Sequence, residues 1–251
     1  MNNLAFIYEH GVKGIKKDFQ KAFQLYQQAS SLDNPYSIGN LADIYFHGRE
    51  GVEKNIEKAM EMFNKSAELN NTISMNILAD IYLNGKGGVE RDLDKSIQLL
   101  QKSSLLGDHV ALNYLANIYY RGVEGLERNI HKSFQLFQRA ANLGNSDALN
   151  SLGYLYQMGD GVEKDIRKSL YYFQISINLG NSKAMHNLAQ IYEFGIEGVE
   201  KDVQKGKKIF SFFFFFLIHF FFITKAIKLY QMSALKGNQL SIKKLNKREY
   251  L

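Results

Sequence analysis

The chain has 251 residues, of which 45% are hydrophobic and 22% charged, and 31 basic against 25 acidic residues give it a net charge of +6. It contains no cysteine, which excludes disulfides, zinc-thiolate and iron–sulfur sites, and thiol catalysis. The charges are mixed along the chain except at the Lys-rich end "IKKLNKREYL", so we do not expect the basic face of a nucleic-acid-binding protein. The N-terminal "MNNLAFIYEHG" lacks the basic stretch and apolar run of a signal peptide.

Three residue types recur together along the chain. A tyrosine stands before a glycine-rich turn, an Asp or Asn follows the turn, and a lysine comes three residues later. The tyrosines are Tyr8, Tyr45, Tyr82, Tyr119, Tyr156 and Tyr192; the acids or amides are Asp18, Asn55, Asp92, Asn129, Asp165 and Asp202; the lysines are Lys21, Lys58, Lys95, Lys132, Lys168 and Lys205. Successive copies lie 36 or 37 residues apart. Three markers that keep one period predict six structural repeats.

Each unit begins with a predicted helix that is apolar on one side, as Leu112, Leu115 and Tyr119 are in "ALNYLANIYYRG". We expect this helix to end at glycine, here Gly122, a residue suited to a left-handed backbone. The Asp or Asn after the loop is expected to cap the second helix by accepting a free backbone N–H. The second helix carries its own apolar stripe, which in "IHKSFQLFQRAANLGN" is Ile130, Phe134, Phe137 and Ala141.

A helix pair of this size cannot bury its apolar stripes alone, whereas stacking on neighbouring pairs does so. The sequence therefore predicts an all-α fold: an α-solenoid of six stacked helix–turn–helix repeats of 36–37 residues each, plus a terminal half-repeat. The expected units are residues 3–36, 37–73, 74–110, 111–147, 148–183 and, as the start of the sixth, 184–205, with the rest of the sixth and the half-repeat at 226–251. Because no capping segment precedes the first unit, we expect the chain to be a piece of a longer protein.

The repeated pattern "NLAxIYxxGxxGVEKDxxKAxxLYQxSAxLGN" resembles the Sel-1-like repeat, a relative of the tetratricopeptide repeat with a longer loop between its helices. The resemblance is clearest in "SLGYLYQMGDGVEKDIRKSLYYF" and "NLAQIYEFGIEGVEKD". It implies a non-enzymatic scaffold or adaptor that binds a protein or peptide, as in signalling scaffolds and adaptors of endoplasmic-reticulum degradation. The family often has tryptophan in the second helix, where this chain has Leu25, Met62, Leu99, Leu136, Tyr172 and Leu229. We expect a cytoplasmic protein with no catalytic residue, cofactor or metal.

A phenylalanine-rich block, "KKIFSFFFFFLIHFFFITKA", interrupts the sixth repeat. Lys205 is still in register, and the expected continuation resumes at Ala226 as "AIKLYQMSALKGN". Residues 206–225 therefore form a predicted insertion of twenty residues, which within a helix would rotate the following side chains by roughly 200°. The codons for Gly206-Lys207 and Lys225-Ala226 can supply a splice donor and acceptor around a pyrimidine-rich stretch of Phe codons. Our hypothesis is that the block is a translated, unspliced intron, which sequencing of the mature transcript tests.

The alternative interpretation of the block is a membrane anchor over residues 209–223. These fifteen residues are fewer than the roughly twenty that a spanning helix needs, although lysines flank both ends. On this alternative the protein would be a membrane-associated adaptor.

The residue after each marker tyrosine changes from unit to unit, and Phe46, Leu83 and Tyr120 form an apolar run across three consecutive units. Two interpretations are open for these three residues: packing between neighbouring units, or anchoring of a peptide in a concave groove. The recurring lysine is expected to extend its stem over the packed face with its amine in water, or to pair with an acid of the next unit.

Overall fold

The computed structural model describes residues 1–11, 14–196 and 199–209, and all regular elements in this part of the chain are helices. They are α1 (Asn2–His10), α2 (Phe19–Ser30), α3 (Pro35–His47), α4 (Ile56–Glu68), α5 (Thr72–Asn84), the short 3₁₀ helix η1 (Lys86–Gly88), α6 (Leu93–Leu105), α7 (His109–Arg121), α8 (Ile130–Asn142), α9 (Ser146–Met158), α10 (Ile166–Asn178) and α11 (Ser182–Phe194). Residues 203–209 are also helical.

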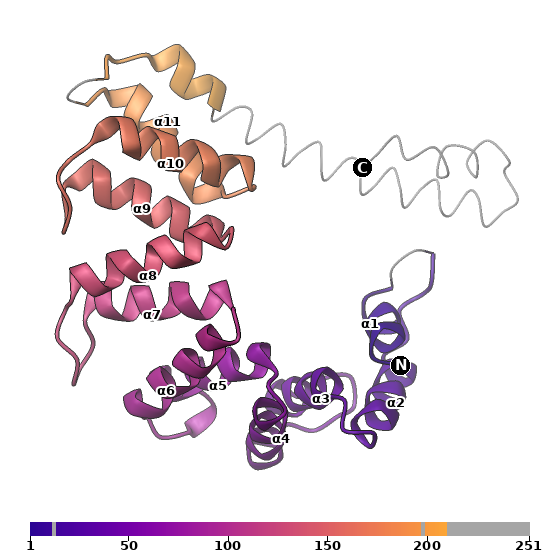
Figure 1. Cartoon of the computed structure of the whole chain (residues 1–251). Coiled ribbons are helices and arrows are strands. Elements are labelled where there is room, and N and C mark those ends of the chain that lie inside the picture. The colour runs from indigo at the N-terminus through magenta and orange to yellow at the C-terminus, as the bar shows by residue number, and fades with distance from the viewer. Residues whose placement is uncertain (12–13, 197–198, 210–251) are drawn as a thin grey trace, which may run out of the picture.

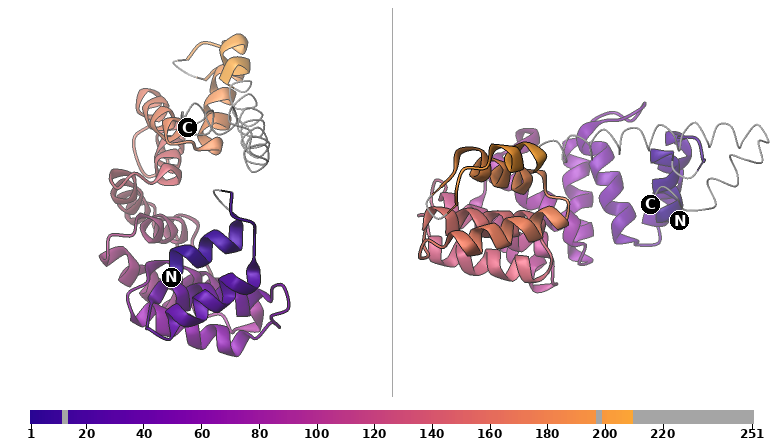
Figure 2. Two further views of the ribbon diagram at one scale, coloured as in Figure 1. Left: turned by 90° about the vertical axis from the view of Figure 1, so that its right-hand side faces the viewer. Right: turned by 90° about the horizontal axis from the view of Figure 1, so that it is seen from above.

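The helices stack in chain order into an arc (Figure 1). Each helix contacts the one before and the one after it, and the second view of Figure 2 shows neighbouring helices side by side. In Figure 1, α3 and α5 lie on the inner side of the arc and α4 and α6 on its outer side. The predicted all-α solenoid is thereby confirmed. Residues 210–225 of the predicted insertion, the continuation at 226–251 and nearly all of the proposed anchor at 209–223 lie outside the described residues.

The three marker residues of each unit meet at the loop between its two helices. In the fourth unit the backbone N–H of Asn129 donates to the carbonyl oxygen of Tyr119 at 2.8 Å. The Asn129 side chain accepts the backbone N–H of Lys132 at 2.9 Å and so caps α8 as predicted. The Lys132 ammonium lies 4.0 Å from the centroid of the Tyr119 ring, a cation–π contact. The sequence period therefore repeats a single cluster that closes each helical hairpin.

The recurring lysine is exposed in all six units, as expected, but its amine also has a partner that the sequence did not predict. In all six units its amine lies over the tyrosine ring of the same unit, at 4.0–5.2 Å from the ring centroid. Where it also pairs with an acid, as Lys95 does with Asp92 at 3.0 Å, the acid is the helix cap of its own unit. The reason is geometric: the first turn of the second helix runs back past the last turn of the first, where the tyrosine ring is the nearest surface.

Gly122 shows why glycine ends the first helix. Its φ of 66° and ψ of 157° belong to a region that residues with a Cβ rarely adopt. A Cβ there would also lie 3.0 Å from the backbone nitrogen of Arg128. The positive φ agrees with the expectation, but ψ is extended rather than helical, because the chain turns directly into a small loop closed by Val123 and Leu126.

The seams between units are joined by the residues that cap the first helices, which are not among the three marker residues of the repeat. Asn71 caps α5 by accepting the N–H groups of Ile73 and Ser74 at 3.0 and 3.4 Å. Its amide also donates to the carbonyl oxygen of Pro35, in the preceding unit, at 3.0 Å. Asn145 does the same toward His109 at 3.2 Å. One side chain thus caps a helix and fixes the position of its neighbour.

The acidic caps predict how stability depends on pH. The backbone N–H of Lys95 donates to the Asp92 carboxylate and lowers its pKa, and Lys168 lowers the pKa of Asp165 in the same way. Because these folded-state values lie below those of the unfolded chain, the stabilisation is present above about pH 4 and is lost as the pH falls through the folded-state pKa.

We therefore expect the double variant D92N/D165N to match the wild type in urea unfolding at pH 7 and to lose less stability at pH 3. Asparagine suits the position, since Asn55 and Asn129 occupy it in other units. An identical loss of stability on acidification in both proteins would contradict the prediction.

Among the residues that the structure describes, no helix combines the length and the apolarity needed to cross a membrane.

Candidate functional site: the inner face of the arc

The inner face is formed by four positions of each first helix, which follow its N-cap by two, six, nine and thirteen residues and share one side of the helix. These positions hold Tyr36, Asn40, Asp43 and His47 in α3; Ile73, Ile77, Asp80 and Asn84 in α5; Val110, Tyr114, Asn117 and Arg121 in α7; Asp147, Ser151, Tyr154 and Met158 in α9; and Lys183, Asn187, Gln190 and Phe194 in α11. Large apolar side chains among them are exposed: Tyr36, Ile73, Val110, Tyr114, Tyr154, Met158 and Phe194.

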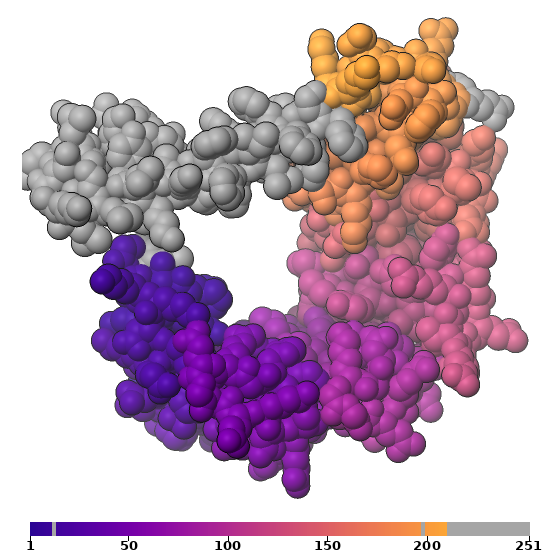
Figure 3. All heavy atoms as spheres, turned by 180° about the vertical axis from the view of Figure 1, so that it is seen from behind, coloured from indigo at the N-terminus to yellow at the C-terminus, as the bar shows by residue number. Residues whose placement is uncertain are grey.

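Hollows between these helices show that the positions face one another. One hollow of about 380 Å³ is lined by Asp80 of α5, Asn117 of α7 and Lys183 of α11. A second, of about 140 Å³, is lined by Asn117, Tyr154 of α9 and Asn187 of α11. Residues from helices that are one to three units apart therefore border the same space. The curvature of the stacked helices is also visible with all atoms drawn (Figure 3).

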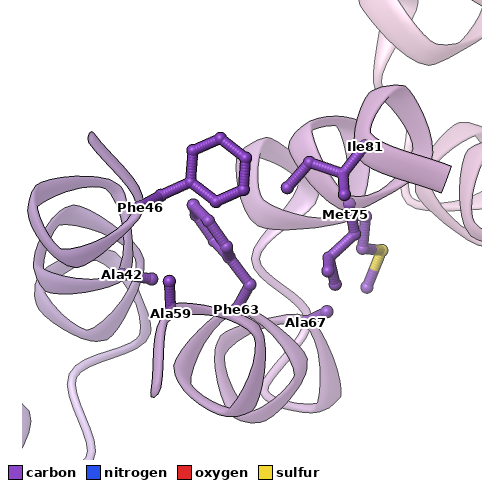
Figure 4. Packing of buried hydrophobic residues seen from close by; sticks show 8 residues of the cluster. Ala42, Phe46, Ala59, Phe63, Ala67, Met75 and Ile81 are labelled. Atoms are coloured by element: carbon purple, nitrogen blue, oxygen red, sulfur yellow. The ribbon is translucent and has the colours of Figure 1, made fainter. Parts of the chain in front are cut away.

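Phe46, the first of the three sequence-predicted groove residues, lies in the core. Its side chain is 9% exposed and packs edge-on against Phe63 of α4, with ring centroids 6.3 Å apart (Figure 4). Met75 and Ile81 of α5 belong to the same cluster. The loop of the next unit covers the Phe46 ring, since a Cβ on Gly87 would lie 3.0 Å from it.

Leu83 and Tyr120 are half-buried and border the two hollows. Leu83 lines the larger hollow and Tyr120 the smaller one. The Tyr120 hydroxyl donates to Asp160 at 3.0 Å, and its ring lies 5.0 Å from the guanidinium of Arg128. Burial, together with the hydrogen bond to Asp160, raises the pKa of the Tyr120 phenol. Phe46 therefore lies in the core, whereas Leu83 and Tyr120 border the hollows of the inner face.

The repeat pattern, the caps and this stacked arrangement agree with one family. A model described as "Sel1 repeat" matches residues 1–34, 35–71, 72–108, 109–145, 146–181, 182–211 and 223–238. The chain belongs to the Sel1 repeat family. The sixth and seventh matches leave residues 212–222 uncovered, within the phenylalanine-rich block.

Solved Sel1 repeat structures resemble this one closely. A Sel1 repeat protein from Oxalobacter formigenes is 30% identical, with a TM-score of 0.77 over 84% of either chain. The protective antigen c5321 of uropathogenic Escherichia coli, which displays an SLR fold, is 31% identical, with a TM-score of 0.64 over 96% of this chain and 46% of that one. The chain therefore spans less than half of the E. coli protein. The immunity protein PA5088 from Pseudomonas aeruginosa, 18% identical with a TM-score of 0.57 over 83% of this chain and 79% of its own, shares the fold. A search of curated proteins returned no match.

Proteins with the Sel1 repeat fold generally serve as protein–protein interaction scaffolds and are typically non-catalytic. In this Sel1 repeat chain the inner-face positions differ between units: two residues after the cap stand Tyr36, Ile73, Val110, Asp147 and Lys183. Seven residues after the cap, on the buried side, each of the helices α3, α5, α7, α9 and α11 has leucine: Leu41, Leu78, Leu115, Leu152 and Leu188. The residues beside the marker tyrosine, among them Phe46, Leu83 and Tyr120, do not belong to these positions. A comparison of the polar sides of the first helices would have found the inner face.

Proposed function

We propose that this Sel1 repeat protein is a non-enzymatic scaffold that holds an extended segment of a protein partner along its inner face. The observation that carries the proposal is the row of exposed apolar side chains on successive first helices, among them Tyr36, Tyr114 and Tyr154. Exposed aromatic residues beside hollows are typical anchors for peptide side chains. The absence of cysteine fits a reducing compartment, and we propose that the protein acts in the cytoplasm.

The two hollows are open on the inner face and can serve as subsites for peptide side chains. The larger one, at about 380 Å³, is bordered by several asparagine amides, and the smaller one, at about 140 Å³, by Tyr154 and Phe137. Polar amides can pair with the peptide backbone while apolar walls accept individual side chains. Leu83 and Tyr120 are part of this proposed surface, whereas Phe46 supports it from the core.

The proposal predicts that peptides selected for binding to the full chain depend on the inner-face tyrosines. Peptide binders are first isolated from a displayed dodecapeptide library and then measured by fluorescence anisotropy. The double variant Y114A/Y154A is expected to weaken binding about tenfold or more, the effect of losing about 1.4 kcal/mol of contact. These side chains are 39% and 42% exposed, so their removal leaves the core intact.

The matched control is Tyr171→Ala, because Tyr171 is 61% exposed and lies on the outer helix α10. It should bind the selected peptides as the wild type does, and thermal melting should show all three proteins folded. Equal affinity of the wild type and Y114A/Y154A would exclude the inner face as the binding surface.

A further inference from the structure

The larger hollow of the inner face, between α5, α7 and α11, has an excess of positive charge. Arg91, Arg121 and Lys183 line it, and Asp80 is its only acid within the described part of the chain. Asp80 is already occupied, since it pairs with Lys86 and accepts an amide hydrogen bond from Asn84 at 2.7 Å. We name Arg91, Arg121 and Lys183 the basic trio.

The basic trio is only weakly neutralised by neighbouring acids. Arg121 is exposed and, among the described residues, forms no ion pair. Arg91 is held by the carbonyl oxygen of Leu83 at 3.1 Å, and its nearest acid, Glu124, is 3.7 Å away and 91% exposed. Lys183 lies 3.5 Å from Asp147, and both side chains are largely in solvent. Such exposed pairs contribute little, so the hollow keeps a positive potential that attracts anions.

A neutral amide lies in the same wall. Asn113 lines the hollow, and its side chain forms no hydrogen bond within the described residues. Its Oδ1 is buried without a partner, which is costly for a polar atom. The Nδ2 of the same amide is left to donate to a ligand oxygen. Asn117, one turn further along α7, borders both hollows.

The basic hollow adjoins the smaller hollow, which has apolar residues in one part of its wall and which we call the apolar hollow. The two share Asn117 and Arg121 as a common wall, and beyond it lie Phe137, Tyr154 and Leu155. A ligand that fills both must carry a negative charge and, beside it, an apolar side chain. A peptide with an acidic residue next to an aromatic or aliphatic one has this chemistry.

The acidic residues at the other end of the inner face are already paired, so they do not favour a basic partner segment. Arg49 pairs with both Glu9 and Asp43, at 2.9 and 2.6 Å. Of these charges, Arg121 forms no ion pair within the described residues, and Arg91 and Lys183 form only exposed ones. The charge balance therefore favours an acidic partner segment over a basic one.

We propose that the two hollows recognise an acidic segment of a protein partner, with a side-chain carboxylate among the basic trio and a neighbouring apolar side chain against Tyr154. This inference rests on the proposed function and adds to it the chemistry of the partner. In this proposal Leu83 forms part of the wall of the basic hollow, and Tyr120 forms part of the wall of the apolar hollow.

The test uses three pools of fluorescein-labelled octapeptides with amidated C-termini. Each pool fixes a tyrosine or leucine beside a variable residue, which is Asp or Glu in the acidic pool, Asn or Gln in the amide pool, and Lys in the basic pool. The full chain is expected to bind the acidic pool at least tenfold more tightly than the amide pool at low salt. The difference should shrink at high salt, where the charges are screened.

Two charge-matched variants locate the effect. R121Q/K183Q should lose the preference for the acidic pool and keep the affinity for the amide pool. K102Q/R139Q removes the same charge from the exposed side of the outer helices α6 and α8 and should behave as the wild type.

The outcomes separate this inference from the proposed function. Equal binding of the acidic and amide pools, or the tightest binding by the basic pool, overturns the acidic preference. If the acidic and the amide pool both lose affinity in Y114A/Y154A, the inner face is still the binding surface, and the proposed function stands without the acidic preference. If no pool binds, or none responds to Y114A/Y154A, both proposals fail.

Discussion

A chain without residues 206–225 is expected to be more stable than the full chain, by about 2 kcal/mol. In the five complete units, the residue four places after the cap of the second helix is small and fully buried: Ala22, Ala59, Ser96, Ser133 and Ser169. The next residue is large and apolar: Phe23, Met60, Ile97, Phe134 and Leu170. In the sixth unit these places hold Gly206 and an exposed Lys207. The deletion would bring in Ala226 and Ile227 and restore the pattern.

The magnitude follows from those two positions. Glycine to alanine inside a helix contributes about 0.5–1 kcal/mol, and partial burial of an isoleucine in place of lysine about 1 kcal/mol more. A Cβ at position 206 would lie 3.0 Å from the Ala189 carbonyl oxygen, so α11 must move outward slightly. Ala22 and Ala59 show that the hairpin accepts a methyl group there.

Urea unfolding followed by circular dichroism measures the difference. The matched control removes residues 206–224 only, which places Lys225 at the buried position and rotates every later residue by about 100°. It should gain no stability. If the two deletions behave alike, or if the twenty-residue deletion is less stable than the full chain, residues 206–225 are part of the fold and our insertion hypothesis fails.

Phe46→Ala is expected to lower the free energy of unfolding by about 3 kcal/mol or more, the usual cost of removing a buried phenylalanine. The ring is 9% exposed and supports Phe63, which is fully buried. Leu83→Ala serves as the comparison, because Leu83 is half-buried and should cost less than half as much. Denaturant unfolding of both variants measures the two losses, and equal losses would contradict the placement of Phe46 in the core.

The position of Phe46 in the core affects the design of any binding experiment on Phe46, Leu83 and Tyr120. If Phe46 is replaced together with Leu83 and Tyr120, a loss of binding reports unfolding as well as loss of contact. Leu83→Ala with Tyr120→Phe avoids the problem, since the second change keeps the ring and removes only the hydroxyl that donates to Asp160. The inner-face tyrosines Tyr114 and Tyr154 remain the sharper test of the groove.

Most of the repeat unit could be predicted from the sequence because its determinants are local. The cap residue, the tyrosine and the lysine lie within one loop's length of one another, as with Tyr119, Asn129 and Lys132. Their spacing therefore records their contacts directly. The contact between the lysine amine and the tyrosine ring was not predicted, because spacing shows which residues meet and not which atoms do.

The sequence by itself determined the repeat period, the helical hairpins and the caps of the second helices, since each depends on contacts inside one hairpin. Only the tertiary structure decided which surface lines the inside of the arc. Phe46 and Tyr120 hold equivalent places in their units, yet the loop around Gly87 covers the first, while the second reaches Asp160 in a neighbouring loop that is one residue shorter. Burial at such a position therefore depends on the adjacent unit. Arg121 of α7 and Lys183 of α11 likewise border one hollow only because separate hairpins stack into a curve.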